Sequence, residues 1–321
     1  MTMHTSSVNN RAIERWKADS AASVDFYNSW FLNFAPPSFR AARGEAAKKV
    51  ERAFKLTENG RRLDAATLLA HPQILAVARQ LTCPPLARDR LSGLSGVSSG
   101  FIKRCEDSDG SKLPANDRPR MQAVLNVISK MLDRDILTWL SDDDGNPSAQ
   151  RRNRAALVIA DRLCGALADP ILRNAQEKRQ LAALTKWLVA HGYRGVSPKT
   201  HADLDPGQFA IHLNMPCRVS EKSPETVNVS VDMAILPHCA AKGDVPILFE
   251  AKSAGDFVNV NKRRKEEAKK MDQLRGQYGE SVRYILFLCG YFDATYLGYE
   301  ASEGIDWIWE HRIDDMEALG L

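Results

Sequence analysis

The chain has 321 residues, of which 44% are apolar and 26% charged, and its formal net charge is +4. This composition is ordinary for a globular protein of about two domains, and so mild a positive charge does not by itself indicate nucleic-acid binding. No apolar run is long enough to span a membrane, and the polar first ten residues lack an apolar signal segment, so we expect a cytoplasmic protein. The six cysteines are scattered without a Cys-x-x-Cys pair, which fits reduced thiols.

The first half of the chain is predicted to be helical. A helix over residues 11–34 carries an aromatic cluster typical of a core, and Pro36-Pro37 is expected to end it. Further helical patterns follow up to residue 140. Residues 141–148, with three aspartates, Gly, Asn and Pro, break all periodicity. We therefore expect a helical, DNA-contacting domain over residues 1–148 and a second domain over residues 149–321.

One stretch of the first half, residues 86–106, resembles a helix-turn-helix. One helix is expected to end near Gly96, and Ser98 can cap a second helix whose inward face is Phe101, Ile102 and Cys105. The side chains that would then face DNA are Ser99, Lys103 and Arg104. An ordinary helical hairpin is the alternative, and Gly100 favours it because glycine weakens a recognition helix.

In the second half, helices are expected at residues 150–167 and 170–191, followed by two neighbouring strands. Residues 227–236 alternate strictly, so the apolar residues at odd positions 227–235 share one face and Asp232 lies on the other. Residues 245–252 form the second strand, in which Glu250 and Lys252 point the same way. The link at residues 237–244 contains Pro and Gly and suits a hairpin-like return, so Asp232 can lie beside Glu250 and Lys252.

Two carboxylates and an ammonium at one sheet edge suggest a metal site. Close carboxylates repel each other, and a hard divalent cation such as Mg²⁺ removes that conflict while leaving positions for water and phosphate oxygens. Lys252 would then orient a water or stabilise charge on a phosphate. The simpler alternative is an exposed ion pair on a solvated strand face. The strand context of Asp232 and Glu250 favours the metal site.

A basic helix and a buried strand follow. The helix begins with four consecutive cations, Lys262, Arg263, Arg264 and Lys265. A charge run is usually a solvated face, but beside a metal site these cations could neutralise phosphates that flank a scissile bond. Residues 282–289 are almost continuously apolar, as expected for a central strand. Strand, helix and strand in this order predict a parallel crossover connection.

The order Asp, then Glu-x-Lys, on adjacent strands resembles the catalytic core of the PD-(D/E)xK nuclease superfamily. More specifically, residues 250–257 and 261–268 are similar to the XamI-type restriction endonucleases, as are Tyr27-Asn28-x-Trp30-Phe31 and residues 84–91. The resemblance implies an α+β fold, with a helical N-terminal domain and a restriction-endonuclease-like core whose mixed central sheet is flanked by helices. It implies a type II enzyme that cuts double-stranded DNA at a short specific site with Mg²⁺.

The resemblance also implies roles for the site residues. Asp232, Glu250 and the backbone carbonyl of Ala251 would hold Mg²⁺, and Lys252 would assist catalysis. The helix before the first core strand often supplies a further acid, for which Glu177 is a candidate and Asp203 and Asp205 are competitors. The proline that often precedes the first acid in the superfamily is replaced here by Val231, so the motif departs from the pattern at this position.

The ends of the product would be 5′-phosphate and 3′-hydroxyl. A two-fold DNA target calls for a homodimer, and a restriction–modification system implies a cognate DNA methyltransferase. Two rival functions remain open on the residues alone. One is a sequence-specific DNA-binding regulator whose acidic strand site is inert. The other is a structure-specific DNA repair nuclease with the same chemistry.

Overall fold

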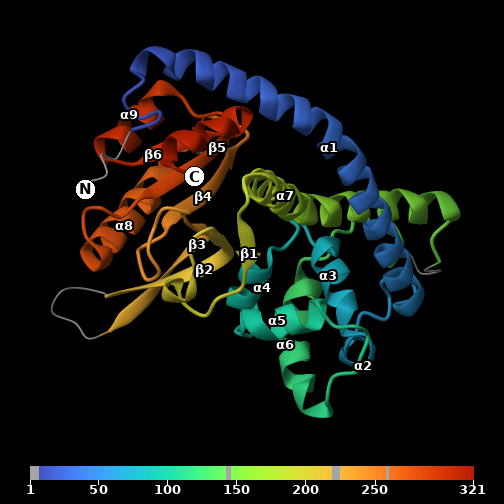
Figure 1. The fold of residues 1–321 in the computed structure, drawn as a ribbon. Coiled ribbons are helices and arrows are strands. Elements are labelled where there is room, and N and C mark those ends of the chain that lie inside the picture. Colours follow the sequence, from blue (N-terminus) through green and yellow to red (C-terminus); the bar gives the residue numbers. More distant parts are fainter. Residues whose placement is uncertain (1–6, 142–145, 219–224, 258–259) are drawn as a thin grey trace. The chain divides into compact units, whose positions relative to one another are not determined.

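The computed structural model describes residues 7–141, 146–218, 225–257 and 260–321, which form two compact units (Figure 1). The sheet unit comprises Met1–Phe34 and Arg173–Leu321, and the helical unit comprises Ala35–Leu172. The units do not divide at residue 148, because the first 34 residues belong with the sheet and the helical unit continues to Leu172. Among the described residues, no helix has the length and apolarity to cross a membrane. All six cysteines are unpaired.

The sheet unit is built on six strands that lie in sequence order. They are β1 (Arg194–Val196), β2 (Gln208–Arg218), β3 (Thr226–Leu236), β4 (Ile247–Ala254), β5 (Tyr284–Gly290) and β6 (Asp306–Trp309). The pairs β2–β3 and β3–β4 are antiparallel, and the other three pairs are parallel. The helix α8 (Val260–Tyr278) connects β4 to β5, and α9 (Ala294–Ser302) connects β5 to β6. The predicted hairpin, the parallel crossover and the mixed sheet of an α+β fold are therefore confirmed.

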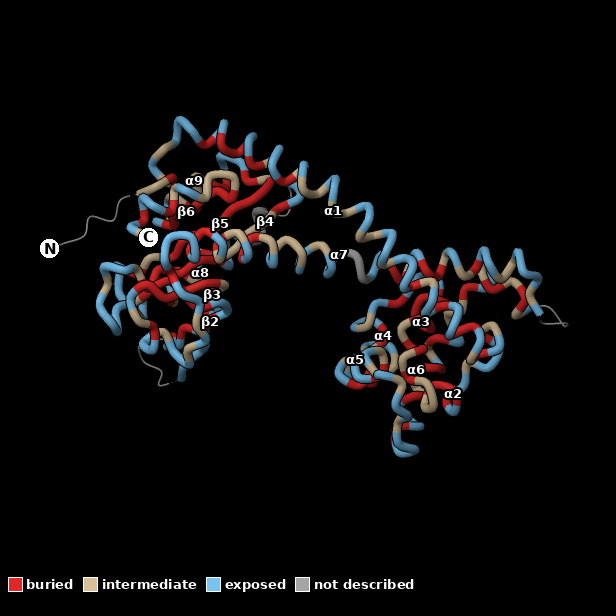
Figure 2. Tube along the Cα trace, turned by 45° about the vertical axis from the view of Figure 1, so that its right-hand side comes forward, coloured by how far each residue is buried: buried red, intermediate tan, exposed pale blue. Residues whose placement is uncertain are grey.

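Helices cover both faces of the sheet (Figure 1). On one face, α8 and α9 contribute Met271, Leu274 and Leu297 to a core with Leu286 and Leu288 of β5. On the other face, α7 (Ala149–Ala190) and the 3₁₀ segment η6 (Glu310–Leu319) pack their apolar residues on β3 to β6. Burial on both faces explains the continuous apolar pattern of β5, which Figure 2 colours as buried.

Strand β3 changes its alternation part-way along. Val229 and Val231 pack in the core on the α8 side, whereas Met233 and Ile235 pack in the core on the α7 side. The prediction that the odd-numbered residues 227–235 share one face is therefore wrong. The alternation changes at Asp232, the residue that carries the predicted first acid.

The helices α1 (Ile13–Leu56) and α7 are each continuous, so the predicted breaks at Pro36-Pro37 and near residue 168 are wrong. Pro36 and Pro37 are exposed, as are Leu32 and Asn33, whose carbonyl groups lose their helical donors. Water can satisfy these carbonyls, which is why a proline pair is tolerated here. Pro170 is likewise an exposed residue inside α7. In both helices, the prolines lie within three residues of the point where the chain passes from one unit to the other.

The helical unit holds short helices between these two long ones. They are α2 (Ala65–Ala70), α3 (Leu75–Ala78), α4 (Arg88–Ser95), α5 (Ser99–Glu106) and α6 (Arg118–Lys130). The 3₁₀ segments are Pro72–Ile74, Arg79–Leu81, Ala115–Asp117 and Thr138–Ser141, and His201–Asp203 lies in the sheet unit. As expected, α4 ends at Gly96 with φ 68°, and the Ser98 hydroxyl accepts a hydrogen bond from the N–H of Phe101 at the start of α5.

Candidate active site

Strands β3 and β4 separate at Asp232 and Glu250. Their pairing ends at Met233 and Phe249, and the next step would place Asp232 opposite Glu250. Here a side chain replaces the strand ladder: Oδ2 of Asp232 accepts a 2.8 Å hydrogen bond from the N–H of Ala251. Beyond this point, β3 continues its pairing with β2, and β4 continues its pairing with β5. The two strands therefore form a fork with an acidic residue on each arm.

The side of the fork that faces α8 carries two ion-paired lysines. Lys252 Nζ lies 3.1 Å from Glu250 Oε1 and 2.9 Å from Glu267 Oε1. Lys270 Nζ lies 2.6 Å from the same Glu250 oxygen. Glu267 is fully buried and Glu250 is 7% exposed, so these charges interact with little solvent screening.

The sequence reasoning missed both α8 residues, although their spacing carried a signal. Glu267 and Lys270 are three residues apart, so they lie on one face of the helix. That face also carries Met271 and Leu274, which are buried against the sheet. Charged residues in line with an inward apolar stripe indicate a polar site beneath the helix.

The pKa values of Asp232 and Lys252 are shifted by burial and by neighbouring charges. Burial, and next the charge of Glu250, raise the pKa of Asp232, against the opposing effects of the Ala251 N–H and Lys252. Burial lowers the pKa of Lys252, but Glu250 and Glu267 outweigh it, so the net shift is upward. Oε2 of Glu250 is buried and accepts no hydrogen bond from the described residues. Crowded carboxylates with an unused oxygen fit a hard divalent cation, which prefers oxygen ligands.

The fork opens into a pocket of about 260 Å³ between α7 and the strands. Asp232, Glu250 and Lys252 all line it, together with Glu177 of α7. One turn further along α7, Gln180 donates hydrogen bonds to the carbonyls of Lys252 and Phe287, at 3.2 and 2.9 Å. This amide fixes α7 against β4 and β5, which places Glu177 at the pocket.

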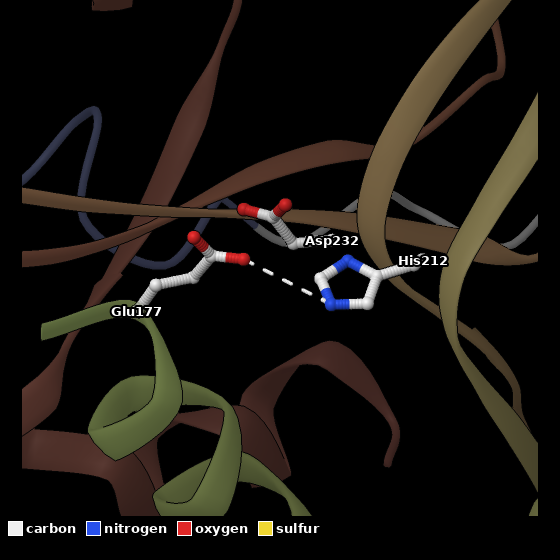
Figure 3. A group of neighbouring side chains, drawn as sticks. All are labelled: Glu177, His212 and Asp232. Atoms are coloured by element: carbon white, nitrogen blue, oxygen red, sulfur yellow. Dashed lines mark ion pairs between the residues drawn. The ribbon is translucent and has the colours of Figure 1, made fainter. Parts of the chain in front are cut away.

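A histidine that the sequence reasoning did not consider lies at the same place. His212 of β2, Glu177 and Asp232 each offer a ligand atom, and these atoms lie within 4.8 Å of one another (Figure 3). His212 Nε2 is 3.8 Å from Glu177 Oε1. The strand over residues 208–218 was not predicted, so nothing in the sequence indicated that His212 would lie opposite Asp232.

The backbone of His212 is left-handed, with φ 55°. Regular register pairs Ile211 with Met233 and Leu213 with Val231, but the pair between them, His212 with Asp232, is skipped. The left-handed conformation costs a non-glycine residue roughly 1–2 kcal/mol. It also reverses the alternation of β2, so that Phe209 packs on the α7 side and Leu213 on the α8 side. The matching change in β3 occurs directly opposite, at Asp232.

The competing acids lie elsewhere. Asp203 lies inside the 3₁₀ segment His201–Asp203, and its Oδ2 accepts a hydrogen bond from the N–H of Thr200, the N-cap residue of that segment. Asp205 forms an ion pair with Lys242 at 2.9 Å. Neither aspartate lines the pocket, whereas Glu177 does.

Comparison with known proteins gives the family. Residues 58–309 match the XamI restriction endonuclease family, a region that covers most of the chain and includes the whole fork.

The chain belongs to the XamI restriction endonuclease family.

The resemblance drawn from residues 250–257 and 261–268 is thus confirmed. This XamI-family chain is also 48% identical over 322 residues to the type II restriction enzyme SalI of Streptomyces albus G, a match that covers 95% of this chain and 97% of that protein. Among solved structures, it is similar to protein VC1899 from Vibrio cholerae, with a TM-score of 0.28 and 11% identity over 85% of this chain and 54% of that one.

The predicted DNA-contacting residues of this XamI-family chain have different surroundings. Lys262, Arg263 and Arg264 lie in α8, but their side chains fall outside the described residues, and Lys265 is exposed. In the helical unit, the Ser99 hydroxyl donates to Asp89 at 3.0 Å. Arg104 is 3.0 Å from Asp117 and lies over the ring of Phe101. Lys103 is exposed.

Proposed function

We propose that this type II restriction endonuclease makes Mg²⁺-dependent double-strand cuts at a short, palindromic DNA sequence, leaving 5′-phosphate and 3′-hydroxyl ends. The observation that carries the proposal is the fork, because it brings two carboxylates and an ammonium into one pocket. Family membership supplies the class of substrate. The pocket supplies groups suited to phosphodiester hydrolysis.

In this proposal, Asp232, Glu250 and the backbone carbonyl of Ala251 hold Mg²⁺, with Glu177 at the edge of the same pocket. When bound, the cation would polarise a phosphate oxygen and lower the pKa of a water molecule. Lys252 remains an ammonium and stabilises negative charge that develops on the phosphate. The buried carboxylate of Glu267 holds that ammonium in place.

DNA binding is assigned to positive and polar side chains outside the pocket. Lys262, Arg263, Arg264 and Lys265 at the start of α8 would neutralise the phosphates that flank the scissile bond. In the helical unit, Ser99, Lys103 and Arg104 of α5 would face DNA in the manner of a recognition helix. Exposure of Lys103 and Lys265 supports these roles.

A palindromic target requires two active sites related by a two-fold axis, so we assign the enzyme to a homodimer with one fork for each strand. A cognate DNA methyltransferase would protect the same sequence in the host, and both proteins would act in the cytoplasm.

Digestion of a plasmid of known sequence, followed by sequencing of the fragment ends, tests the proposal. We expect discrete fragments only with the divalent cation present. Lys252→Ala should lower the cleavage rate by at least about 100-fold and retain binding to the target in Ca²⁺. Lys269→Ala, an exposed neighbour on α8, is the matched control.

Three outcomes would overturn the proposal. Cleavage by Lys252→Ala at the parental rate would remove Lys252 from the mechanism. An intact plasmid that shifts on a gel would favour a DNA-binding regulator. Cutting confined to forks or flaps, without fragments defined by sequence, would favour a repair nuclease.

A further inference from the structure

The imidazole of His212 lies beside two acids of the fork pocket, Glu177 and Asp232. Glu177, His212 and Asp232 come from three different elements, α7, β2 and β3, and their side chains converge (Figure 3). Each offers one ligand atom, and the three atoms are within 4.8 Å of one another. Ligand distances of about 2.0–2.2 Å require the ligand atoms of one cation to be no more than about 4.4 Å apart, so a small rotation of these side chains brings all three within reach of a single ion.

A second observation points to a ligand at this place. Glu250 lines the same pocket, and its buried Oε2 has no hydrogen-bond partner among the described residues. Its other oxygen is already shared by Lys252 and Lys270. The pocket that Glu177 and Asp232 line therefore also holds a carboxylate oxygen without a hydrogen-bond donor among the described residues, and a cation is a species that would use it.

The backbone of β2 sets the position of His212. An extended residue would have continued the register with Asp232, whereas the left-handed φ of 55° interrupts it at this one pair. The imidazole is thereby placed toward Glu177, 3.8 Å away.

We propose that Glu177, His212 and Asp232 form a second cation position that accepts first-row transition metals such as Mn²⁺ through the imidazole nitrogen of His212. The inference rests on the proposed nuclease centre, with which the new position shares Asp232. An all-oxygen set suits Mg²⁺, whereas imidazole nitrogen is a ligand for transition metals. His212 therefore gives the enzyme a cation preference that the Asp232 and Glu250 pair alone would not have.

Electron paramagnetic resonance of Mn²⁺ bound to the full chain, without DNA, tests the position directly. We expect two Mn²⁺ ions per chain and an echo modulation from a coordinated ¹⁴N nucleus. His212→Asn should abolish that modulation and lower the affinity for the second ion by at least about tenfold. Asparagine is chosen because it tolerates the left-handed backbone. His71→Asn, in the helical unit, is the control and should retain both ions and the modulation.

A Gln variant of Glu177 gives a second measurement, which leaves the left-handed backbone of His212 unchanged. Glu177→Gln should lower the affinity for the same Mn²⁺ ion that His212→Asn affects. It should also reduce the amplitude of the ¹⁴N modulation. Persistence of the modulation in His212→Asn, or its absence in the parent, would overturn the position. Weaker DNA binding by His212→Asn with unchanged Mn²⁺ binding would instead make His212 a DNA contact.

Failure of this position and failure of the proposed function give different results. If the parent shows no ¹⁴N modulation but still cuts the plasmid, and Lys252→Ala does not, the second position is wrong and the nuclease centre stands. If Lys252→Ala cuts at the parental rate, the nuclease centre is wrong whatever the Mn²⁺ spectra show.

Discussion

The ammonium of Lys252 lies 2.9 Å from a carboxylate oxygen of Glu267, a residue that is fully buried in α8. Glu267 does not line the pocket, so in the proposed mechanism it would act through Lys252 as a positioning residue. Its negative charge opposes the desolvation of Lys252, which would otherwise favour the neutral amine. The contact therefore helps to fix both the place and the charge of the lysine.

Glu267→Gln should lower kcat by about tenfold to 100-fold with little change in KM, because the amide keeps the shape but not the charge. Steady-state cleavage rates over a series of concentrations of a plasmid carrying the target measure both parameters. Glu266→Gln changes the exposed neighbour on the same helix and should leave kcat unchanged. An equal loss of DNA affinity and of kcat in Glu267→Gln would indicate general disruption rather than positioning.

Lys270 would compete with the cation of the proposed metal site, because its ammonium contacts the same carboxylate of Glu250. Its Nζ is 2.6 Å from Glu250 Oε1 and also donates to the carbonyl of Ser230. Lys270→Met should increase the affinity for Mn²⁺ several-fold, since it removes a positive charge that competes at about 3 Å, where Coulomb energies are of kcal/mol size even at a high effective dielectric. Titration calorimetry measures the affinity, with Lys269→Met as control. A lower affinity would show that Lys270 orders Glu250 rather than competes for it.

Asp64 caps α2 in the helical unit. Its Oδ1 accepts a 2.8 Å hydrogen bond from the N–H of Thr67, and this bond is the largest reason that the pKa of Asp64 is lowered. Asp64→Ala should reduce the free energy of unfolding by about 1 kcal/mol at pH 7. A carboxyl with a lowered folded pKa stabilises the fold above its unfolded value, near 3.9, and loses that effect as the pH falls through the folded value.

The difference in the free energy of unfolding between Asp64→Ala and the parent should therefore be constant from pH 7 to about pH 5. It should shrink as the pH falls below about 4. Urea unfolding at a series of pH values measures it. Asp135→Ala, which changes an exposed aspartate of the same unit, should show no such difference. If the difference in the free energy of unfolding between Asp64→Ala and the parent instead grew as the pH fell, the capping role would be contradicted.

Lys103 and Arg104 are exposed neighbours on α5, and Arg104 forms an ion pair with Asp117. Lys103→Ala should weaken DNA binding and reduce the slope of log K against log salt by about 1, as expected for one lost phosphate contact. Arg104→Ala should also reduce stability, because Arg104 pairs with Asp117, which is 5% exposed. Salt-dependent binding in Ca²⁺ measures the slope, and Lys112→Ala is the exposed control. An unchanged slope for Lys103→Ala would remove α5 from the DNA interface.

Local patterns predicted the elements around the fork well. The strands expected at residues 227–236 and 282–289 correspond to β3 and β5 within two residues at each end. Their signals, strict alternation and a continuous apolar run, depend only on short-range periodicity. The pair Phe101 and Cys105 was likewise placed inward from helical spacing, and both are buried.

Features set by tertiary context could not be predicted in this way. The sequence of residues 208–218 alternates poorly because β2 changes its face at His212, so the strand and its histidine were both missed. The pair Pro36-Pro37 predicts a helix end, but local steric rules do not say whether the freed carbonyls reach water. Helical spacing places Glu267 in line with Met271 and Leu274, but it does not say that a charged side chain on that face finds a buried partner in Lys252.

The chain leaves the sheet unit after Phe34 and returns at Arg173. The outgoing and incoming segments are neighbours in that unit: the Gln176 amide donates to the Tyr27 hydroxyl at 2.8 Å, and the guanidinium of Arg179 lies 4.4 Å over the Trp30 ring. Residues 35–172 are thus a cassette inserted at one spot of an otherwise continuous scaffold. If this inserted segment recognises the DNA sequence, recombination between relatives could exchange it as a unit. The cleavage site would then change while the residues of the fork are inherited unchanged.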